Sequence, residues 1–246
     1  LNNAKLQGKF IQRFKHFNGE VLEIPENKIE EEKKIKGIKK IEEDSLVTAQ
    51  PYNVRPHVPQ SLVYPETPTY PCLETIFWQV TEEGINAKNV WDSYSVTGEG
   101  IKIAVLDTGV NYSLPEVGTY LSGYSWVPMT DSADHDPIDN GVLNYPSSVG
   151  DHTYSSYPSG AGHGTTVTST ACGKGLIPDE MKSVAGVSYG AGYYALKVLR
   201  SGRTGEVPGG VFIGSGRISW IISALEWCLD LTHKPDIINM SFGTTD

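Results

Sequence analysis

The chain is poor in two features that would place it in common classes of protein. It has three cysteines in 246 residues, Cys72, Cys172 and Cys228, and no two lie close together. An odd number of widely spaced cysteines indicates neither a disulfide framework nor a metal knuckle, so we expect buried thiols. The longest apolar runs, such as IAVL, are far shorter than the roughly 20 residues that cross a bilayer. No membrane-spanning segment is therefore predicted.

Positive charge is also scarce. The chain has 20 Lys and Arg residues against 29 Asp and Glu residues, which gives a net charge of -9 at pH 7. A nucleic-acid surface requires a basic stripe, so we exclude a nucleic-acid partner. Since 39% of the residues are hydrophobic and 20% are charged, the chain can form one sizeable domain and a smaller one. No secretory signal can be read from Leu1 onward, which leaves the destination open.

The composition changes near residue 50. Residues 1–50 carry 10 of the 20 Lys and Arg residues but none of the 13 tyrosines and none of the 5 tryptophans. Residues 14–25 alternate like a strand, residues 26–36 indicate a short charged helix, and residues 37–47 indicate a second strand. Residues 1–50 are thus predicted to form a separate small α+β unit.

Prolines mark the next segment. Six of the 15 prolines fall between Pro51 and Pro71, so we expect residues 51–76 to be a linker. Strands and helices then alternate over residues 77–246, as in a parallel sheet covered by helices. The sequence therefore predicts an α/β domain over this range.

Asp107 ends the clearest strand of the chain, GIKIAVLDTGV. Such a continuous apolar run suits a parallel strand buried on both faces, and open α/β sheets form their ligand crevices at the carboxyl ends of their strands. Asp-Thr-Gly also permits a turn cap. It occurs in aspartic proteases as well, but their mechanism needs two carboxylates and the chain has no second Asp-Thr-Gly.

His163 lies between two glycines in GHGTTVTSTACGKG. The glycines permit close approach of other groups, while Val167 and Ala171 place one helix face inward and His163 on the first turn. The positive end of the helix dipole disfavours imidazolium, which keeps the ring able to accept a proton. A lone histidine is more often structural, but together with Asp107 it indicates a general base.

These two motifs resemble those of the subtilisin-like serine proteases. GEGIKIAVLDTGV is similar to the family's aspartate strand, GHGTTVTS to its histidine helix, and INAKNVWD to the short helix before them. SWIISALEWCLDLTHKPDIINMSFG resembles a further helix and the substrate-binding strand. The resemblance covers residues 77–246 and implies a mostly parallel sheet with helices on both faces. It also implies a serine endopeptidase in which Asp107 and His163 belong to an Asp-His-Ser triad.

The chain departs from the family pattern in three places. Thr166 stands where the family usually has histidine, behind the imidazole, so we expect little effect. After DPID, residues 140–161 form an insertion rich in Ser, Gly, Pro and Tyr, which predicts a surface loop near the cleft. No serine before Asp246 lies in the family's Gly-Thr-Ser motif, so we expect the nucleophile and the oxyanion asparagine downstream. The alternatives are a degenerate domain that only binds peptides and a structural module with a vestigial cleft.

The resemblance also implies a peptide groove and a core helix. Its two rims would pair with the backbone of an extended substrate by strand addition, although Gly-Ser-Gly alone could simply cap a loop. The rim residues are Gly214, Ser215, Gly216, Ser241, Phe242 and Gly243. Helical spacing places Trp220, Ile221, Ala224, Leu225 and Cys228 in the core.

Residues 10–50 resemble the second half of the family's inhibitory propeptide, whose last residues lie in the substrate groove. The resemblance implies a folding assistant and temporary inhibitor that is cleaved between Thr48 and Pro71. It favours an extracellular or cell-surface location. Glu116 falls where the family often has a calcium ligand, but residues 175–187 lack the usual asparagine pattern. We therefore assign no metal or other cofactor.

Overall fold

The computed structural model describes most of the body and of the leading segment. The ranges that it describes are residues 8–49, 82, 84–128, 136–138, 162–175, 185–200 and 214–243. The predicted linker over residues 51–76, the predicted insertion loop over residues 140–161, and Cys72 lie outside these ranges.

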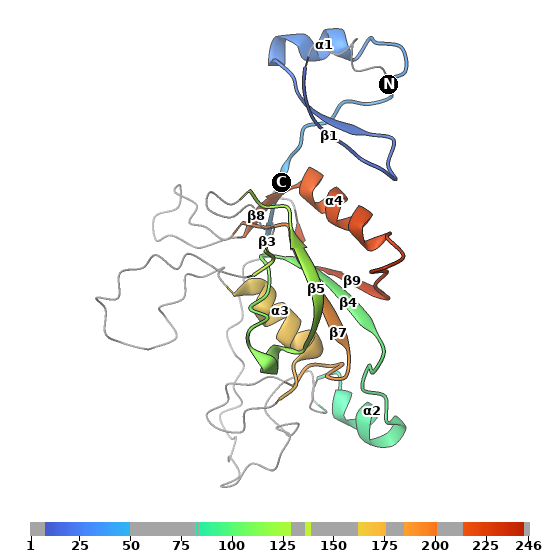
Figure 1. Ribbon diagram of the computed structural model, residues 1–246, viewed down its shortest axis with the longest axis vertical. Helices are drawn as coiled ribbons and strands as arrows, with labels where there is room; N and C mark the ends of the chain where they lie inside the picture. The colour runs from blue at the N-terminus through green and yellow to red at the C-terminus, as the bar shows by residue number, and fades with distance from the viewer. Residues whose placement is uncertain are drawn as a thin grey trace, which may run out of the picture.

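A parallel sheet of four strands forms the centre of the body (Figure 1). Its strand order is β5-β7-β4-β9, and each neighbouring pair is parallel. The strands are β4 (Lys102–Asp107), β5 (Thr119–Ser125), β7 (Gly192–Lys197) and β9 (Ile237–Met240). The apolar run that predicted a doubly buried strand is β4, where Ala104, Val105 and Leu106 are fully buried.

Helices cover both faces of this sheet. Because side chains alternate along a strand, Val105 faces α3 (His163–Cys172) whereas Leu106 faces α4 (Ile218–Cys228). A third helix, α2 (Ala87–Tyr94), packs through Trp91. This arrangement confirms the predicted α/β class with a mostly parallel sheet and helices on both faces. No helix in the described ranges has the length and apolar character needed to cross a membrane.

The core prediction for α4 is confirmed. Ile221, Ala224 and Cys228 are buried, and Trp220 and Leu225 pack against them. Both cysteines within the described ranges are buried free thiols. Burial raises the pKa of Cys172 to about 12 and that of Cys228 to about 11, so neither is a ready nucleophile.

The leading segment has a different local structure from the one predicted. Residues 14–25 do not form one strand, because the chain turns after Phe14 and the Phe14 amide donates to the Gly19 carbonyl. An antiparallel hairpin results, made of β1 (Lys9–Arg13) and β2 (Glu20–Glu23). Its turn contains Asn18-Gly19, a dipeptide that favours tight turns.

The expected helix and second strand are also shorter than predicted. Residues 26–36 contain only a 3-10 turn, Glu26–Lys28, followed by α1 (Ile29–Glu32). Gly37 then adopts a positive φ of 106°, which ends any helical continuation. Residues 38–45 have no regular structure, and β3 forms only over Leu46–Ala49.

Candidate active site

Asp107 lies at the carboxyl end of β4, a strand that is buried from Ile103 onward. Its side chain is fully buried, and its Oδ1 accepts the Thr108 amide N–H at 2.7 Å. The carboxylate is therefore held at the sheet edge where a parallel α/β fold forms its crevice.

His163 is the residue with which α3 begins. The preceding Gly162 has a φ of 83°, a conformation that favours glycine and turns the chain into the helix. The Nδ1 of His163 lies 2.7 Å from Oδ1 of Asp107, and both side chains are buried. When the neutral ring donates from Nδ1 to the carboxylate, Nε2 carries the lone pair that can accept a proton. This geometry is that of a general base oriented by a carboxylate.

Gly164 lets the helix start and the strand end approach each other. A Cβ atom at this position would lie 2.1 Å from the Gly109 carbonyl oxygen and 3.0 Å from Cβ of Asp107. The Gly164 amide, one of those that a helix start leaves without an intrahelical partner, donates to Oγ1 of Thr108 at 3.0 Å. Any larger side chain would therefore push His163 away from Asp107.

Thr166 and Glu116 were the other site-related residues in the sequence. Thr166 is exposed, and its hydroxyl donates to the Gly162 carbonyl at 2.9 Å. Glu116 lies in a 3-10 turn, Pro115–Val117, where its carbonyl accepts the Lys174 amide. No group of three potential metal-ligating side chains occurs among the described residues, whereas residues 176–184 are not described.

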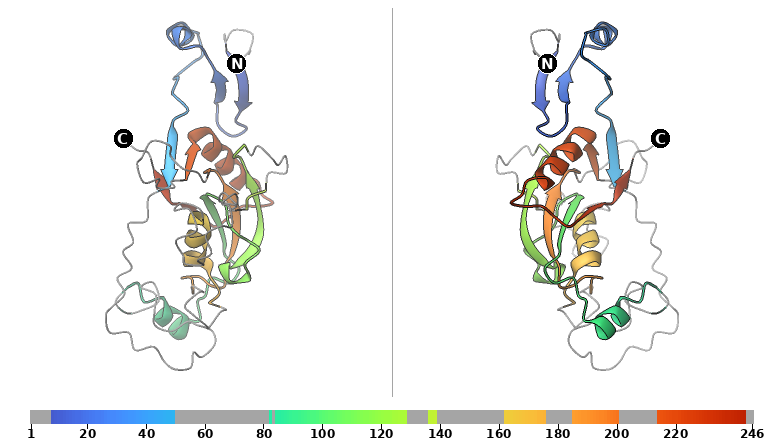
Figure 2. Two further views of the ribbon diagram at one scale, coloured as in Figure 1. Left: turned by 90° about the vertical axis from the view of Figure 1, so that its left-hand side faces the viewer. Right: turned by 90° about the vertical axis from the view of Figure 1, so that its right-hand side faces the viewer.

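The predicted groove residues gather around a strand of the leading segment. Figure 2 shows β3 between β8 (Ser215–Arg217) and β10 (Phe242–Gly243), antiparallel to both. The Ala49 amide donates to the Gly214 carbonyl at 2.7 Å. The paired residues are Val47 with Gly216, Thr48 with Ser215 and Gly243, and Ala49 with Phe242. Ser241 lies just before β10, and its hydroxyl accepts from the Asn239 side-chain amide at 2.9 Å.

Alternate side chains of β3 point into the body. Val47 and Ala49 are 4% and 3% exposed and belong to a core cluster with Leu199, whereas Leu46 is 58% exposed. Gly216 lets β8 lie close against the body, since a Cβ atom there would lie 2.1 Å from the Val198 carbonyl oxygen. The groove thus accepts main chain at both rims and small apolar side chains at every second position.

Asp44 holds the leading segment at the start of α4. Its Oδ1 accepts the Ser219 amide at 2.8 Å, and its Oδ2 accepts the Ser219 hydroxyl at 2.7 Å. The residue preceding the helix, Arg217, offers no side-chain cap of its own. Asp44 therefore supplies the N-terminal cap from a distant part of the chain, which local sequence patterns do not reveal.

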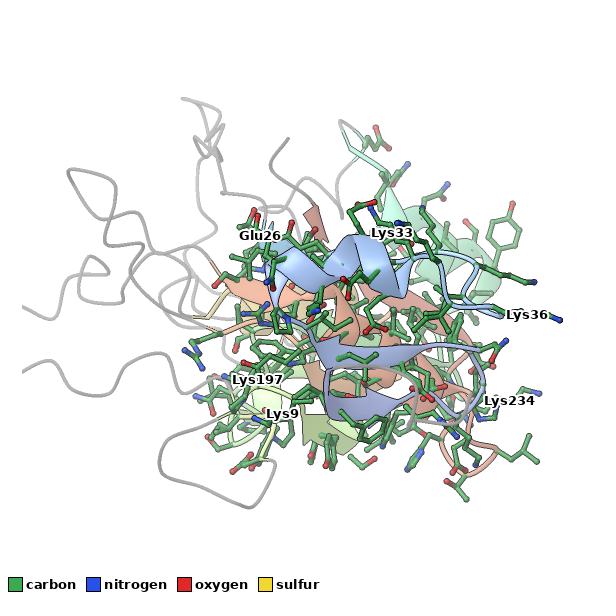
Figure 3. The ribbon with its side chains drawn as sticks, turned by 90° about the horizontal axis from the view of Figure 1, so that it is seen from above. Lys9, Glu26, Lys33, Lys36, Lys197 and Lys234 are labelled. Carbon is green, nitrogen blue, oxygen red and sulfur yellow. The ribbon has the colours of Figure 1, made fainter. Side chains whose placement is uncertain are left out.

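The hairpin contacts the outer side of the same helix. Seen from above (Figure 3), the hairpin and α1 overlie the body, and Lys36 points away from it. Gln12 donates to the Ser223 hydroxyl at 2.7 Å, and the Phe17 amide donates to Glu226 at 3.3 Å. Burial by itself would raise the pKa of Glu226, but the backbone amides of His16, Lys15 and Phe17 together hold it below its ordinary value.

Comparisons with known proteins agree with this geometry. A model of the subtilase family matches residues 98–246. The chain is similar to subtilisin amylosacchariticus of Bacillus subtilis subsp. amylosacchariticus, with 27% identity over 236 residues that cover 96% of this chain and 45% of the relative. It is 30% identical to a subtilisin of Bacillus pumilus over 151 residues, which cover 61% of this chain and 40% of the relative.

A third relative is the extracellular basic protease of Dichelobacter nodosus, which is 26% identical over 198 residues covering 74% of this chain and 30% of that protein. The chain spans less than half the length of these three curated relatives. The family match covers more than half of the chain and includes Asp107, His163 and both groove rims. The resemblance in the sequence motifs is confirmed, and the chain belongs to the subtilase family.

Proposed function

We propose that the full-length protein is a serine endopeptidase, with Asp107 and His163 as two members of its catalytic triad. The observation that carries this proposal is the buried 2.7 Å contact between Nδ1 of His163 and Oδ1 of Asp107, in the domain that also holds a strand between two rims. The serine nucleophile and the oxyanion donors would come from the part of the protein beyond this sequence.

The two residues would act on a proton at His163. Nε2 takes the proton of the attacking serine hydroxyl, and the Asp107 carboxylate stabilises the imidazolium that forms. The same nitrogen then gives the proton to the leaving amine, which allows the peptide bond to break. The buried position of the pair strengthens this electrostatic support because little water screens it.

Substrates would be extended peptides that add a strand between β8 and β10. The burial of Val47 and Ala49 beside an exposed Leu46 supports a preference for small aliphatic side chains at two positions separated by one residue. The intervening residue, like Thr48, would be selected less strictly.

The leading segment would be an inhibitory propeptide that blocks the groove until it is cleaved between Thr48 and Pro71. Its last strand occupies the groove, and the match to subtilisin amylosacchariticus covers 96% of the chain, a share too large to leave this segment out. An extracellular location is proposed with it, since the Dichelobacter nodosus relative is named an extracellular protease.

The rest of the catalytic domain would pair with β9. This strand is one of the two edge strands of the sheet within the described residues, and its Ile237, Ile238 and Met240 side chains are 52%, 39% and 49% exposed. An apolar strand at an open sheet edge is a template for a further strand.

The test is a double-mutant cycle in the full-length protein. His163→Ala and Asp107→Asn should each lower kcat by about 10³- to 10⁶-fold with little change in KM, and the double variant should lose little more. Asp92→Asn, on the exposed surface of α2, is the matched control and should leave kcat unchanged. Residues 1–246 alone should not hydrolyse a fluorogenic peptide.

Two outcomes would contradict the proposal. Losses that multiply in the double variant would show that Asp107 and His163 act independently. A full-length protein that binds a Val-Thr-Ala peptide without cleaving it would instead establish the alternative, a non-catalytic peptide-binding domain.

A further inference from the structure

Lys197 is a buried cation that the proposed mechanism does not use. It ends β7 and lies in register with Asp107 on β4, so the two side chains project from the same face of the sheet. Its exposure is only 2%. Lysine is almost never fully buried unless its charge has partners, so the groups that its ammonium contacts bear on how this part of the fold is held.

The ammonium group of Lys197 joins two separate segments at this edge of the sheet. Nζ donates to the Thr108 carbonyl at 2.7 Å and to the Ile138 carbonyl at 3.0 Å. Hydrogen bonds from a charged donor are stronger than neutral ones, so both carbonyls are held firmly.

Thr108 in turn contacts Asp107 itself and Gly164, the residue that follows His163. Its amide donates to Oδ1 of Asp107 at 2.7 Å, the same oxygen that meets His163. Its Oγ1 accepts the amide of Gly164, the residue after His163, at 3.0 Å. The position of Thr108 therefore sets the end of β4 and the start of α3 together.

We propose that Lys197 is a positioning residue, which orients the Asp107–His163 pair by holding the Thr108 peptide. The chemistry that it serves rests on the proposed endopeptidase function. A displacement of about 1 Å can lower a rate by roughly 100-fold, so a fixed anchor beside the pair matters for turnover.

The charge of Lys197 has an effect of its own. A cation at the end of β7, in register with the strand end that carries Asp107, opposes a second positive charge on the imidazole of His163. Asp136, two residues before Ile138, is a further carboxylate in this part of the described chain, and it accepts the Tyr112 hydroxyl at 2.8 Å. Removing the Lys197 charge leaves both carboxylates in place, so His163 should keep its proton to a higher pH.

The test compares Lys197→Met with Lys102→Met in the full-length protein. Lys102 lies at the opposite end of β4, where its Nζ is 3.4 Å from the His233 carbonyl, and serves as the matched control. Lys197→Met should lower kcat by roughly 10- to 100-fold at unchanged KM. It should also move the acidic limb of kcat/KM upward by roughly 0.5 to 1 pH unit, and Lys102→Met should do neither. A folded Lys197→Met protein whose kcat/KM profile keeps its acidic limb at the parent's pH would overturn the proposal. Lost packing alone would lower the rate without shifting that limb.

A second measurement uses the unaltered protein and remains decisive if Lys197→Met does not fold. The ¹⁵N resonance of the Lys197 ammonium should shift with the same midpoint as the His163 ring in an NMR titration. A Lys197 ¹⁵N resonance that does not change while His163 titrates would refute the positioning role. Coupled midpoints in a protein that cleaves no peptide would refute the endopeptidase function and retain the link between Lys197 and His163.

Discussion

The leading segment meets the body in two regions that differ in kind. At β3, main-chain pairing on both sides and the buried side chains of Val47 and Ala49 hold the strand. At the hairpin, a few polar contacts to α4 suffice, and Phe10 and Ile11 remain 44% and 51% exposed. Most of the docking free energy therefore belongs to β3, whereas the hairpin contributes contacts that depend on ionisation.

The largest expected effect comes from breaking the β3 contact with Val47→Asp. A carboxylate without a partner would be buried among Leu199 and Ile221, at a cost of about 3 kcal/mol or more. Hydrogen exchange at the Ala49 amide, which donates to Gly214, should therefore accelerate by more than about 100-fold.

The matched control for this change is Leu46→Asp. Leu46 lies in the same strand but is 58% exposed. In the Leu46→Asp variant, the Ala49 amide should therefore exchange at nearly the same rate as in the unaltered chain. Equal acceleration by both variants would show that side-chain burial does not hold β3 in place.

An intermediate effect is expected at the link between the two regions, Asp44. Asp44→Ala removes the cap of α4 and should cost about 1 kcal/mol. The Ser219 amide, which loses its acceptor, should then exchange about fivefold faster. Asp92→Ala, whose exposed carboxylate pairs with Lys88 on α2, is the control and should leave Ser219 exchange unchanged. Equal exchange in Asp44→Ala and the parent chain would mean that the cap does not stabilise the helix start.

The smallest effect should appear at the hairpin and only in acid. The pKa of Glu226 lies below its ordinary value of 4.5 when the hairpin is docked, so the docked state binds fewer protons. The contact is fully present above the ordinary pKa and is lost as the pH falls through the lowered pKa. Because the carboxylate is partly exposed and screened, we expect roughly 0.5 kcal/mol.

Amide protection factors at His16 and Phe17, measured between pH 3 and pH 6, check this expectation. Protection should fall on the acid side in the parent chain and be independent of pH in Glu226→Gln. Glu31→Gln, on α1, removes an exposed pair with Lys28 of the preceding 3-10 turn and should retain the parent's pH dependence. If amide protection in Glu226→Gln fell with pH as it does in the parent chain, a group other than Glu226 would be responsible for the pH dependence.

These contrasts also explain how far the sequence predicted the fold. β4 and α4 were predictable because each has a long apolar pattern of its own. β5 has the mixed sequence TYLSGYS and was missed, since its place depends on close packing against β7. A Cβ atom at Gly123 would lie 2.2 Å from the Ala195 carbonyl oxygen, a constraint that no local pattern expresses.

The site residues also differ in how far the sequence predicted them. Asp107 and His163 stand in motifs, so the sequence predicted that they would act together, and the structure places them in contact. Thr108 was missed because its role depends on Gly164, far along the chain. Lys197 carried a usable signal, since it is a single charge inside an otherwise apolar run, YYALKVL. A charge that closes a buried strand merits attention even without a motif.

The path of the chain bears on the proposed release of the leading segment from the groove. β3 ends at Ala49 beside the groove, whereas α2 begins at Ala87 at the opposite end of the body (Figure 1). While the intervening backbone is intact, the groove faces its occupant at an effective concentration that can reach the order of a millimolar. One cut in that backbone changes none of the contacts described above, yet it makes occupancy depend on dilution. A concentrated solution of cut protein would remain blocked, and the same protein diluted far below the dissociation constant would open.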